Sequence, residues 1–337
     1  MANLQTTYMG IALANPIIAG ASELTGHIES VKKIEEAGAG ALVIKSLFEE
    51  QIQLERFKLE EDATMYDHRH PEMINIHPRM EHAGPQEHLT HVKKVKETVK
   101  IPVIASLNCV NRETWLEYAK MLQDTGVDGL ELNFYASPRE QDEKGASIED
   151  DQVAVAEAVV KAVSIPVSVK LSVFYSNPLQ VISRFDQAGV KGFVLFNRMF
   201  QPDINVKEVK HISPFNLSNQ IDNRLPLRFA GLLYGALNGD VCSSTGIFDG
   251  KDVIKMLLAG STCVQVVSTL YRNKITQIQT MLKEIEEWMG DKGHTKLEDF
   301  RGQLSKKHTK NPWTYERAQY VRLLFDAENV IKNAPLI

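Results

Sequence analysis

The chain has 337 residues, of which 43% are hydrophobic and 24% are charged, enough for the core of one large α/β barrel or of two smaller domains. A net charge of -5 gives no general attraction to polyanions, so we expect no nucleic-acid partner. No apolar run could span a bilayer, the first ten residues lack signal-peptide features, and the three cysteines lack CxxC spacing; we therefore expect a cytoplasmic protein with no membrane contact, disulfide bond or iron–sulfur cluster in this chain.

The first residues predict a small hairpin, because LQTTYMGIALANP alternates in polarity and turns at Met9 and Gly10. Eight segments of strand character follow, at 16–21, 41–46, 102–107, 129–134, 166–171, 192–197, 240–244 and 263–268. Runs with helical periodicity separate them, at 29–37, 87–99, 113–125, 148–163, 178–188, 228–237 and 251–259. This alternation predicts a (β/α)8 TIM barrel whose floor is closed by the hairpin.

A unit of helix end, turn and apolar strand recurs four times, at 35–46, 123–134, 186–197 and 258–268. Glycine just past a helix end adopts the left-handed conformation without the penalty of a Cβ atom, and continuous apolar strands are typical of parallel sheets covered by helices. The units end on polar residues, namely Lys45, Asn133, Asn197 and Ser268. In a parallel barrel such residues face the catalytic mouth.

Two regions do not belong to the eight strand–helix units of the predicted barrel. The connection 47–85 is far longer than usual, which is typical of lids and binding loops. Beyond Tyr271 we expect a helix at 275–289 and a last helix near 315–330. The predicted organisation is therefore a barrel at 1–271 and a helical extension at 272–337, packed on the barrel or on a partner subunit.

The ends of the seventh and eighth strands predict a phosphate site. The sequences SSTGIFDG at 243–250 and VVST at 266–269 place small, hydroxyl-bearing residues where barrels commonly bind phosphate through backbone N–H groups and a helix N-terminus. The alternative is an ordinary helix cap, since Ser, Thr and Gly are also good caps.

Lys170 is the strongest single candidate for a site residue. It lies at the end of an otherwise apolar strand, where a charge is costly unless an anionic or electron-rich group meets it. Lys45 has the same position on the second strand. Asn108, Asn133 and Asn197 end the third, fourth and sixth strands, and their amides offer a donor and an acceptor to a heterocycle. The alternative to a site role is that the lysines simply extend into solvent and that the asparagines cap turns.

Together these residues resemble the dihydroorotate dehydrogenase family of FMN-dependent (β/α)8 barrels, over most of residues 4–302. The segments that carry the resemblance are NPIIAGAS at 15–22, GAGALVIKS at 38–46, VKL at 169–171, TG at 245–246, AG at 259–260, VQV at 264–266 and LEDFRG at 297–302. The last of these resembles the soluble branch of the family. The resemblance implies an oxidation of dihydroorotate to orotate by hydride transfer to flavin N5.

The resemblance also implies roles for individual residues. Lys170 would meet the flavin near N1 and O2, where negative charge accumulates on reduction. The cofactor-binding set would be Ala21, Ser22, Lys45, Ser46, Asn108, Asn133, Lys170, Thr245, Gly246, Val267 and Ser268. The substrate would contact Lys45, His82, Asn133, Arg139 and Asn197. Soluble members of the family are usually homodimers, and the predicted last helix has apolar residues beyond the needs of the barrel, so we expect a homodimer.

The loop after the fourth strand and the lid differ from the family pattern. Where the family has Asn-x-Ser-Cys/Ser-Pro-Asn, this chain has NFYASPR at 133–139, one residue longer. Ser137 is the candidate base that takes a proton from a substrate carbon, and Arg139 could pair with a carboxylate. In the lid, alignment on Gly84 places His82 where the family has its second Asn.

These differences keep other functions open. The chain could act on another dihydropyrimidine-like ring, or bind flavin without dehydrogenase activity. A phosphate-binding lyase or isomerase, with Lys170 as a Schiff-base amine, is the alternative from another class. Six of the ten histidines lie in or beside the lid, but they lack a recognisable ligand spacing, so we expect no metal.

Overall fold

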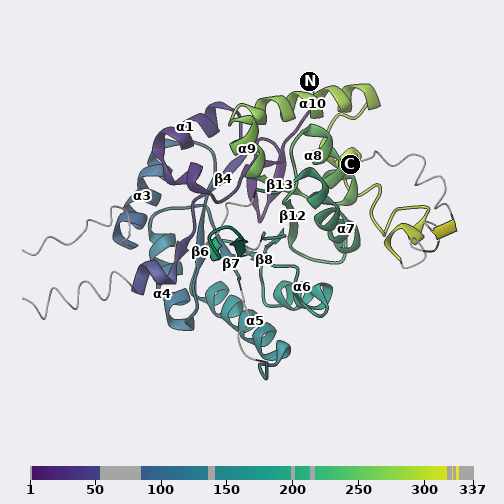
Figure 1. Cartoon of the computed structure of the whole chain (residues 1–337). Helices are drawn as coiled ribbons and strands as arrows, with labels where there is room; N and C mark the ends of the chain where they lie inside the picture. Colours follow the sequence, from purple (N-terminus) through teal and green to yellow (C-terminus); the bar gives the residue numbers. More distant parts are fainter. Residues whose placement is uncertain are drawn as a thin grey trace, which may run out of the picture.

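The computed structural model describes residues 2–53, 85–135, 141–198, 202–212 and 217–316, together with 321, 324 and 325. Eight parallel strands form a closed barrel with helices around it (Figure 1). The strands are β3 (Ile17–Ala19), β4 (Ala41–Val43), β6 (Val103–Asn108), β7 (Gly129–Asn133), β8 (Val167–Leu171), β9 (Gly192–Leu195), β12 (Asp240–Ser244) and β13 (Cys263–Val266). Pairing of β4 with β6 at one side and of β13 with β3 at the other closes the ring. The predicted TIM barrel is therefore confirmed.

The helices that cover the barrel are α1 (Ile28–Glu36), α3 (Pro85–Thr98), α4 (Arg112–Asp124), α5 (Gly145–Ala162), α6 (Pro178–Gln187), α7 (Arg224–Leu233) and α8 (Gly250–Ala259). Each overlaps one of the predicted helical runs. Local chemistry fixes several starts: the side chain of Asn177 accepts from Gln180 N at the start of α6, and that of Asp249 accepts from Asp252 N at the start of α8.

The predicted N-terminal hairpin is present and closes the barrel floor. Strand β1 (Thr6–Tyr8) pairs with β2 (Ile11–Leu13), and Tyr8 and Met9 are buried at the turn. A Cβ atom on Gly192, at the start of β9, would lie 2.6 Å from the Tyr8 hydroxyl, so the tip of the hairpin packs directly on the strand starts. The carboxyl ends of the strands lie at the opposite end of the barrel and carry the mouth.

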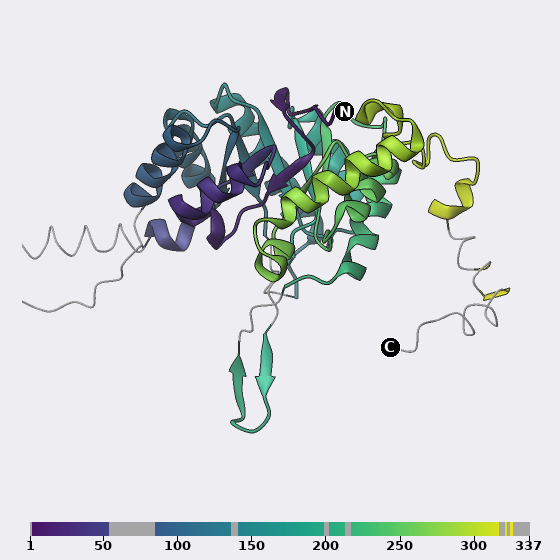
Figure 2. The same cartoon turned by 90° about the horizontal axis from the view of Figure 1, so that it is seen from above.

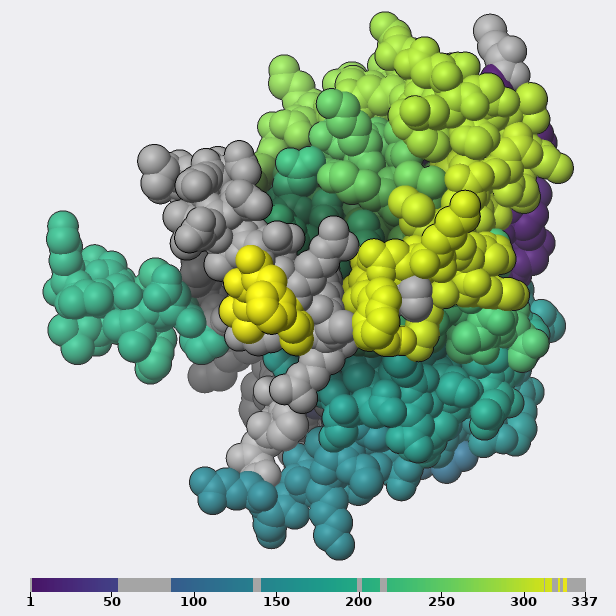
Figure 3. Space-filling view, turned by 90° about the vertical axis from the view of Figure 1, so that its right-hand side faces the viewer, coloured from purple at the N-terminus to yellow at the C-terminus, as the bar shows by residue number. Residues whose placement is uncertain are grey.

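Two further β elements are not in the sequence prediction. Strand β5 (Leu47–Phe48) adds to β6 beyond the ring. Strands β10 (Asp203–Asn205) and β11 (Lys210–Ile212) form a hairpin that projects from the barrel, as Figures 2 and 3 show. The hairpin has few apolar residues in its strands, so no hydrophobic pattern in the sequence predicts it.

After the barrel, α9 (Ser268–Asn273) leads into α10 (Gln277–Lys292), which agrees with the helix predicted at 275–289. Helix α10 packs on α8, and Gly250 N donates to Glu284 Oε2 at 2.5 Å. Short 3-10 turns follow at η3 (Leu297–Asp299) and η4 (Pro312–Tyr315). Most of the predicted last helix lies outside the described residues. That residues 272–337 form a separate extension stays a prediction. Among those residues, no helix is long and apolar enough to cross a membrane.

Candidate active site

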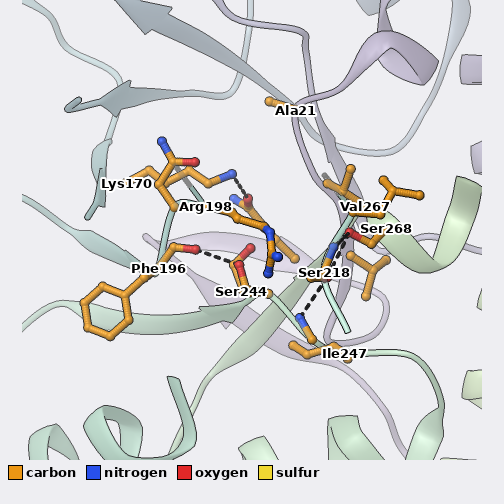
Figure 4. Close-up of a pocket in the computed structure, with 15 residues that line it drawn as sticks. Ala21, Lys170, Phe196, Arg198, Ser218, Ser244, Ile247, Val267 and Ser268 are labelled. Carbon is orange, nitrogen blue, oxygen red and sulfur yellow. Dashed lines mark hydrogen bonds between the residues drawn. The ribbon is translucent and has the colours of Figure 1, made fainter. Parts of the chain in front are cut away.

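A cavity of about 150 Å³ opens at the carboxyl ends of the strands (Figure 4). Its walls come from β3, β8, β9, β12 and β13 and from the segment before α7. The lining residues are Ala21, Lys170, Phe196, Asn197, Arg198, Leu217, Ser218, Ser244, Thr245, Gly246, Ile247, Gln265, Val266, Val267 and Ser268. A groove of about 390 Å³ shares Phe196, Asn197, Arg198 and Thr245 with it, so an extended ligand has room beyond the cavity.

One side of the cavity is a cluster of hydroxyl and backbone N–H groups. Ser268 Oγ accepts hydrogen bonds from Ser218 N at 2.9 Å and from Ser218 Oγ at 2.8 Å. Gly246 N donates to Ser218 Oγ at 3.2 Å. These groups come from three separate segments, the one before α7, the end of β12 and the start of α9. We call this group, Ser218, Gly246 and Ser268, the hydroxyl cradle; it has the donor chemistry that a phosphate requires.

The backbone of the cradle has an unusual conformation at two successive residues. Thr245 has φ = 81° and Gly246 has φ = 76°. A positive φ is uncommon for a β-branched residue, and such outliers cluster at functional sites. Gly246 cannot carry a side chain, because a Cβ atom would lie 2.4 Å from Asn223 N. The Thr245 hydroxyl is committed to Phe196 O at 2.9 Å, which fixes the turn against β9.

Asp252, in the first turn of α8, links the segments on either side of the cradle through hydrogen bonds. Its side chain is fully buried and accepts from Gln220 Nε2 at 2.8 Å, Asn223 Nδ2 at 2.9 Å and Phe248 N at 3.1 Å. It therefore joins the turn η2 (Gln220–Asn223) to the loop after β12. This carboxylate holds two segments of the cradle in register.

Lys170, the strongest candidate from the sequence, is one of the residues that line the cavity. Its side chain extends from β8 into the barrel, the residue as a whole is only 8% exposed, and Nζ donates to Gln265 Oε1 at 3.2 Å. The structure thus brings a cation and the hydroxyl cradle to the same cavity, on neighbouring parts of one barrel mouth. The predicted residues Ala21, Asn197, Thr245, Gly246, Val267 and Ser268 line it too.

Beneath Lys170, a buried carboxyl group completes a polar cluster inside the barrel. Glu131 on β7 is fully buried, and its Oε1 lies 3.9 Å from Lys170 Nζ. Gln265 Nε2 donates to Glu131 Oε2. Loss of hydration raises the pKa of Glu131, while Lys170 and the Gln265 hydrogen bond act in the opposite direction.

The predicted asparagines are placed at the mouth, but in different ways. Asn197 Nδ2 donates to Asn133 Oδ1 at 2.7 Å, so two of the three amides meet. Asn108 is the last residue of β6 and is half-buried; it does not line the cavity.

The other predicted cofactor residues lie near the mouth but outside this cavity. Lys45 Nζ lies 2.5 Å from Glu23 Oε2, and the Ser46 and Ser106 hydroxyls are 2.7 Å apart. Ser22 immediately precedes the turn η1 (Glu23–Gly26). Their roles toward a flavin stay predictions.

Three predicted site residues, His82, Ser137 and Arg139, lie outside the described residues. Within the described part of the chain, no group of three or more His, Cys, Asp or Glu side chains is placed to hold a metal. Cys109, next to Asn108, is buried, and burial raises the pKa of its thiol, which disfavours a thiolate nucleophile there.

Sequence reasoning assigned no role to Glu131, Ser218 or Gln265. Glu131 and Gln265 carried a usable signal, since each is a polar residue inside an apolar strand, GLELN or CVQV, and such a residue needs a buried partner. Ser218 had no such signal in the sequence, because it belongs to an irregular segment that reaches the cradle only through the tertiary fold.

A closed parallel barrel with a cation and a cradle of donors at its mouth defines the class of (β/α)8 barrel enzymes. The sequence model of the family described as dihydroorotate dehydrogenase matches residues 3–289, and the chain belongs to this family. It is accordingly an oxidoreductase of the type that acts on CH–CH bonds.

Individual relatives are distant but cover nearly the whole chain. The catalytic subunit of dihydroorotate dehydrogenase B (NAD(+)) from Methanocaldococcus jannaschii is 26% identical over 314 residues, which span 89% of this chain and 97% of that protein. A putative dihydroorotate dehydrogenase A (fumarate) from Aeropyrum pernix is 25% identical, with 89% and 96% covered. The NAD-dependent dihydropyrimidine dehydrogenase subunit PreA from Escherichia coli is 22% identical, with 89% and 76% covered.

Proposed function

We propose that this chain binds FMN at the barrel mouth and oxidises dihydroorotate to orotate. The observation that carries the proposal is the pairing of Lys170 with the hydroxyl cradle in one cavity. The cradle donors suit the FMN phosphate, and the ammonium suits the edge of the ring where negative charge accumulates on reduction. When bound, FMN supplies the acceptor for a hydride.

The residues around the cavity support this assignment. Gly20 precedes Ala21 and has no space for a side chain, since a Cβ atom would lie 2.8 Å from Val267 Cγ2. The wall next to the cradle is therefore close-packed and has no side chain at Gly20 that would project from it, which suits a flat ring. The residues that would hold FMN are Ala21, Ser22, Lys45, Ser46, Asn108, Asn133, Lys170, Ser218, Thr245, Gly246, Val267 and Ser268.

The substrate would lie against the paired amides. Asn133 and Asn197 offer hydrogen bonds to a ring edge, and Arg139, His82 and Lys45 would complete the site. Ser137 would accept the proton from carbon; a hydroxyl at its ordinary pKa needs a relay for this task.

A second substrate class is a dihydropyrimidine without a carboxylate. The observation in its favour is the similarity, at 22% identity, to the E. coli dihydropyrimidine dehydrogenase subunit. We further propose a cytoplasmic homodimer that itself holds no iron–sulfur cluster and takes its electron acceptor from elsewhere.

The test is anaerobic bleaching of the flavin. We expect the purified protein to be yellow, to release FMN on denaturation and to be bleached by dihydroorotate, with dihydrouracil and dihydrothymine as the comparison. Bleaching by one of the latter alone would move the assignment to the second substrate class. A colourless protein that takes up no FMN would refute the cofactor, and an unchanged rate in Ser137→Ala would exclude Ser137 as the base.

A further inference from the structure

The two carboxyl oxygens of Glu131 have different environments. Oε2 accepts the hydrogen bond from Gln265, whereas Oε1 has no hydrogen-bond partner among the described atoms. Nζ of Lys170 lies 3.9 Å from Oε1 and donates to the opposite end of the Gln265 amide. Lys170, Gln265 and Glu131 therefore form a buried triad in which one amide bridges a cation and a carboxyl group.

Among the described residues, Lys170 is the charged side chain that acts on the pKa of Glu131. Tyr8 from β1 is a titratable neighbour of the triad, and the charge of Glu131 contributes to the raised pKa of Tyr8. Cys242 on β12 and Cys263 on β13 lie in the same buried cluster as Tyr8. Burial raises the pKa values of Tyr8 and Cys263, so both are neutral near pH 7. Ser106 and Ser168, which lie beside Glu131 on β6 and β8, carry no charge. Lys170 is the cation that favours the ionised form of Glu131, against burial, which raises the pKa of this carboxyl group.

A buried carboxylate is stable only while its counter-charge is available. Near the mouth, the same ammonium faces the cavity that the proposed ligand would occupy. An anionic ligand and Glu131 would therefore compete for one positive charge. Once Lys170 is shared with a ligand anion, protonation becomes the less costly state of the carboxyl group.

We propose that Glu131 is the counter-charge of Lys170 and takes up a proton from solvent when an anionic ring engages the Lys170 ammonium. In this step the carboxylate becomes a carboxylic acid, and no other bond changes. Gln265 keeps the two groups in place. Glu131 is thus a positioning residue that acts through Lys170, and the proposal rests on the flavin assignment made above.

The pair itself is tested without flavin, by infrared spectroscopy of the flavin-free protein. In Lys170→Met, Glu131 loses its counter-charge, so we expect a protonated carboxyl stretch near neutral pH that is absent from the wild type. The double variant with Glu131→Gln should lack this band. Absence of the band from Lys170→Met would overturn the proposal, whether or not the protein binds FMN.

The link to the ring is tested by proton uptake during anaerobic photoreduction in weak buffer with an indicator dye. We expect Glu131→Gln to take up about one proton fewer per flavin than the wild type. Glu131→Asp should restore part of the uptake, and Ser168→Ala, a buried change in the adjacent strand position, should leave it unchanged. Equal uptake in wild type and Glu131→Gln would overturn the proposal while leaving the flavin assignment intact.

If Glu131→Gln does not fold, Gln265→Met replaces it, since this change removes the bridge and keeps the volume. We expect an altered pH dependence of the flavin potential in this variant. A pH dependence identical to that of the wild type would count against the triad. Failure of the wild type to bind FMN would refute the proposed function instead, and the infrared band would then decide the inference about the pair.

Discussion

Asn197 donates a 2.7 Å hydrogen bond to Asn133 across the end of β8, although their strands are not neighbours in the sheet. The bond spans the strand that carries Lys170, so the two amides form a bridge over the lysine at the mouth. Each asparagine restricts the other, and a ring that binds there meets amides already oriented.

This bridge predicts coupled effects of mutation. We expect Asn133→Ala and Asn197→Ala each to raise KM for the substrate by about tenfold, in line with the loss of one hydrogen bond of about 1.4 kcal/mol. The double variant should cost less than the sum, because either change alone already breaks the bridge. Steady-state kinetics of the four proteins provide the check, and strict additivity would show that the amides act independently.

Lys170→Met should abolish most flavin reduction. Loss of one preorganised charge next to developing negative charge costs about 100-fold or more in rate. Rapid-mixing measurement of flavin bleaching tests this. Lys161→Met is the matched control, because Lys161 lies on the exposed face of α5 and pairs with Glu157 there. A Lys170→Met rate within twofold of the wild type would remove Lys170 from the site.

Gly246→Ala should weaken FMN binding and destabilise the fold. Alanine at φ = 76° is strained, and its Cβ would lie 2.4 Å from Asn223 N, so the turn of the cradle has to move. Strain of this kind costs about 1–3 kcal/mol. Gly145→Ala is the control, because a Cβ atom there meets nothing within 4 Å. FMN titration and urea unfolding measure both effects, and wild-type FMN affinity in Gly246→Ala would contradict the cradle.

Asp252→Ala should lower stability by about 3–5 kcal/mol, since it leaves buried partners of a carboxylate unpaired. It should also weaken FMN binding, because η2 and the loop after β12 lose their link. Lys255→Met removes a half-exposed partner of the same carboxylate and should cost less than about 1 kcal/mol. Denaturant unfolding of both variants gives the comparison; similar losses would mean that Asp252 acts mainly through its salt bridge.

His88 on α3 predicts a loss of stability in acid. Burial lowers its pKa to about 4 from the ordinary value of 6.5, and its Nε2 has no partner among the described atoms. The unfolded chain therefore binds more protons between these pH values, and stability falls as pH decreases from about 6.5 to 4, by about 2–3 kcal/mol. Urea unfolding at pH 7 and pH 4.5 should show a smaller difference in His88→Leu than in the wild type. An equal difference would assign the acid sensitivity to other groups.

The barrel was predictable because its signals are local. Each strand is an apolar run, and turns such as those at Gly38 and Gly189, both with positive φ, mark the helix ends. The β10–β11 hairpin escaped prediction because its short strands contain mostly polar residues and bury none of them fully.

The site was predictable only in part. Lys170 and Thr245 could be found because position on a barrel strand decides which end a residue faces. Ser218 and the partnership of Glu131 with Lys170 could not, because these contacts depend on where the closed ring brings distant strands. The separation of Glu131 from Gln265 by 134 residues illustrates the limit.

The closure of the ring has a consequence for how this chain folds during synthesis. The first barrel strand, β3, pairs with the last, β13, with Ile17 opposite Val264. A ribosome must therefore deliver the chain as far as β13 before β3 gains its second neighbour, and until then one edge of the sheet stays open. Contacts of such long range slow folding and expose intermediates to aggregation. A circular permutant that starts at α4 would bring β3 and β13 nearer in sequence but would separate β6 from β7, which also pair. The late closure would then move to that pair, and we expect the permutant to refold from urea no faster than the natural chain order.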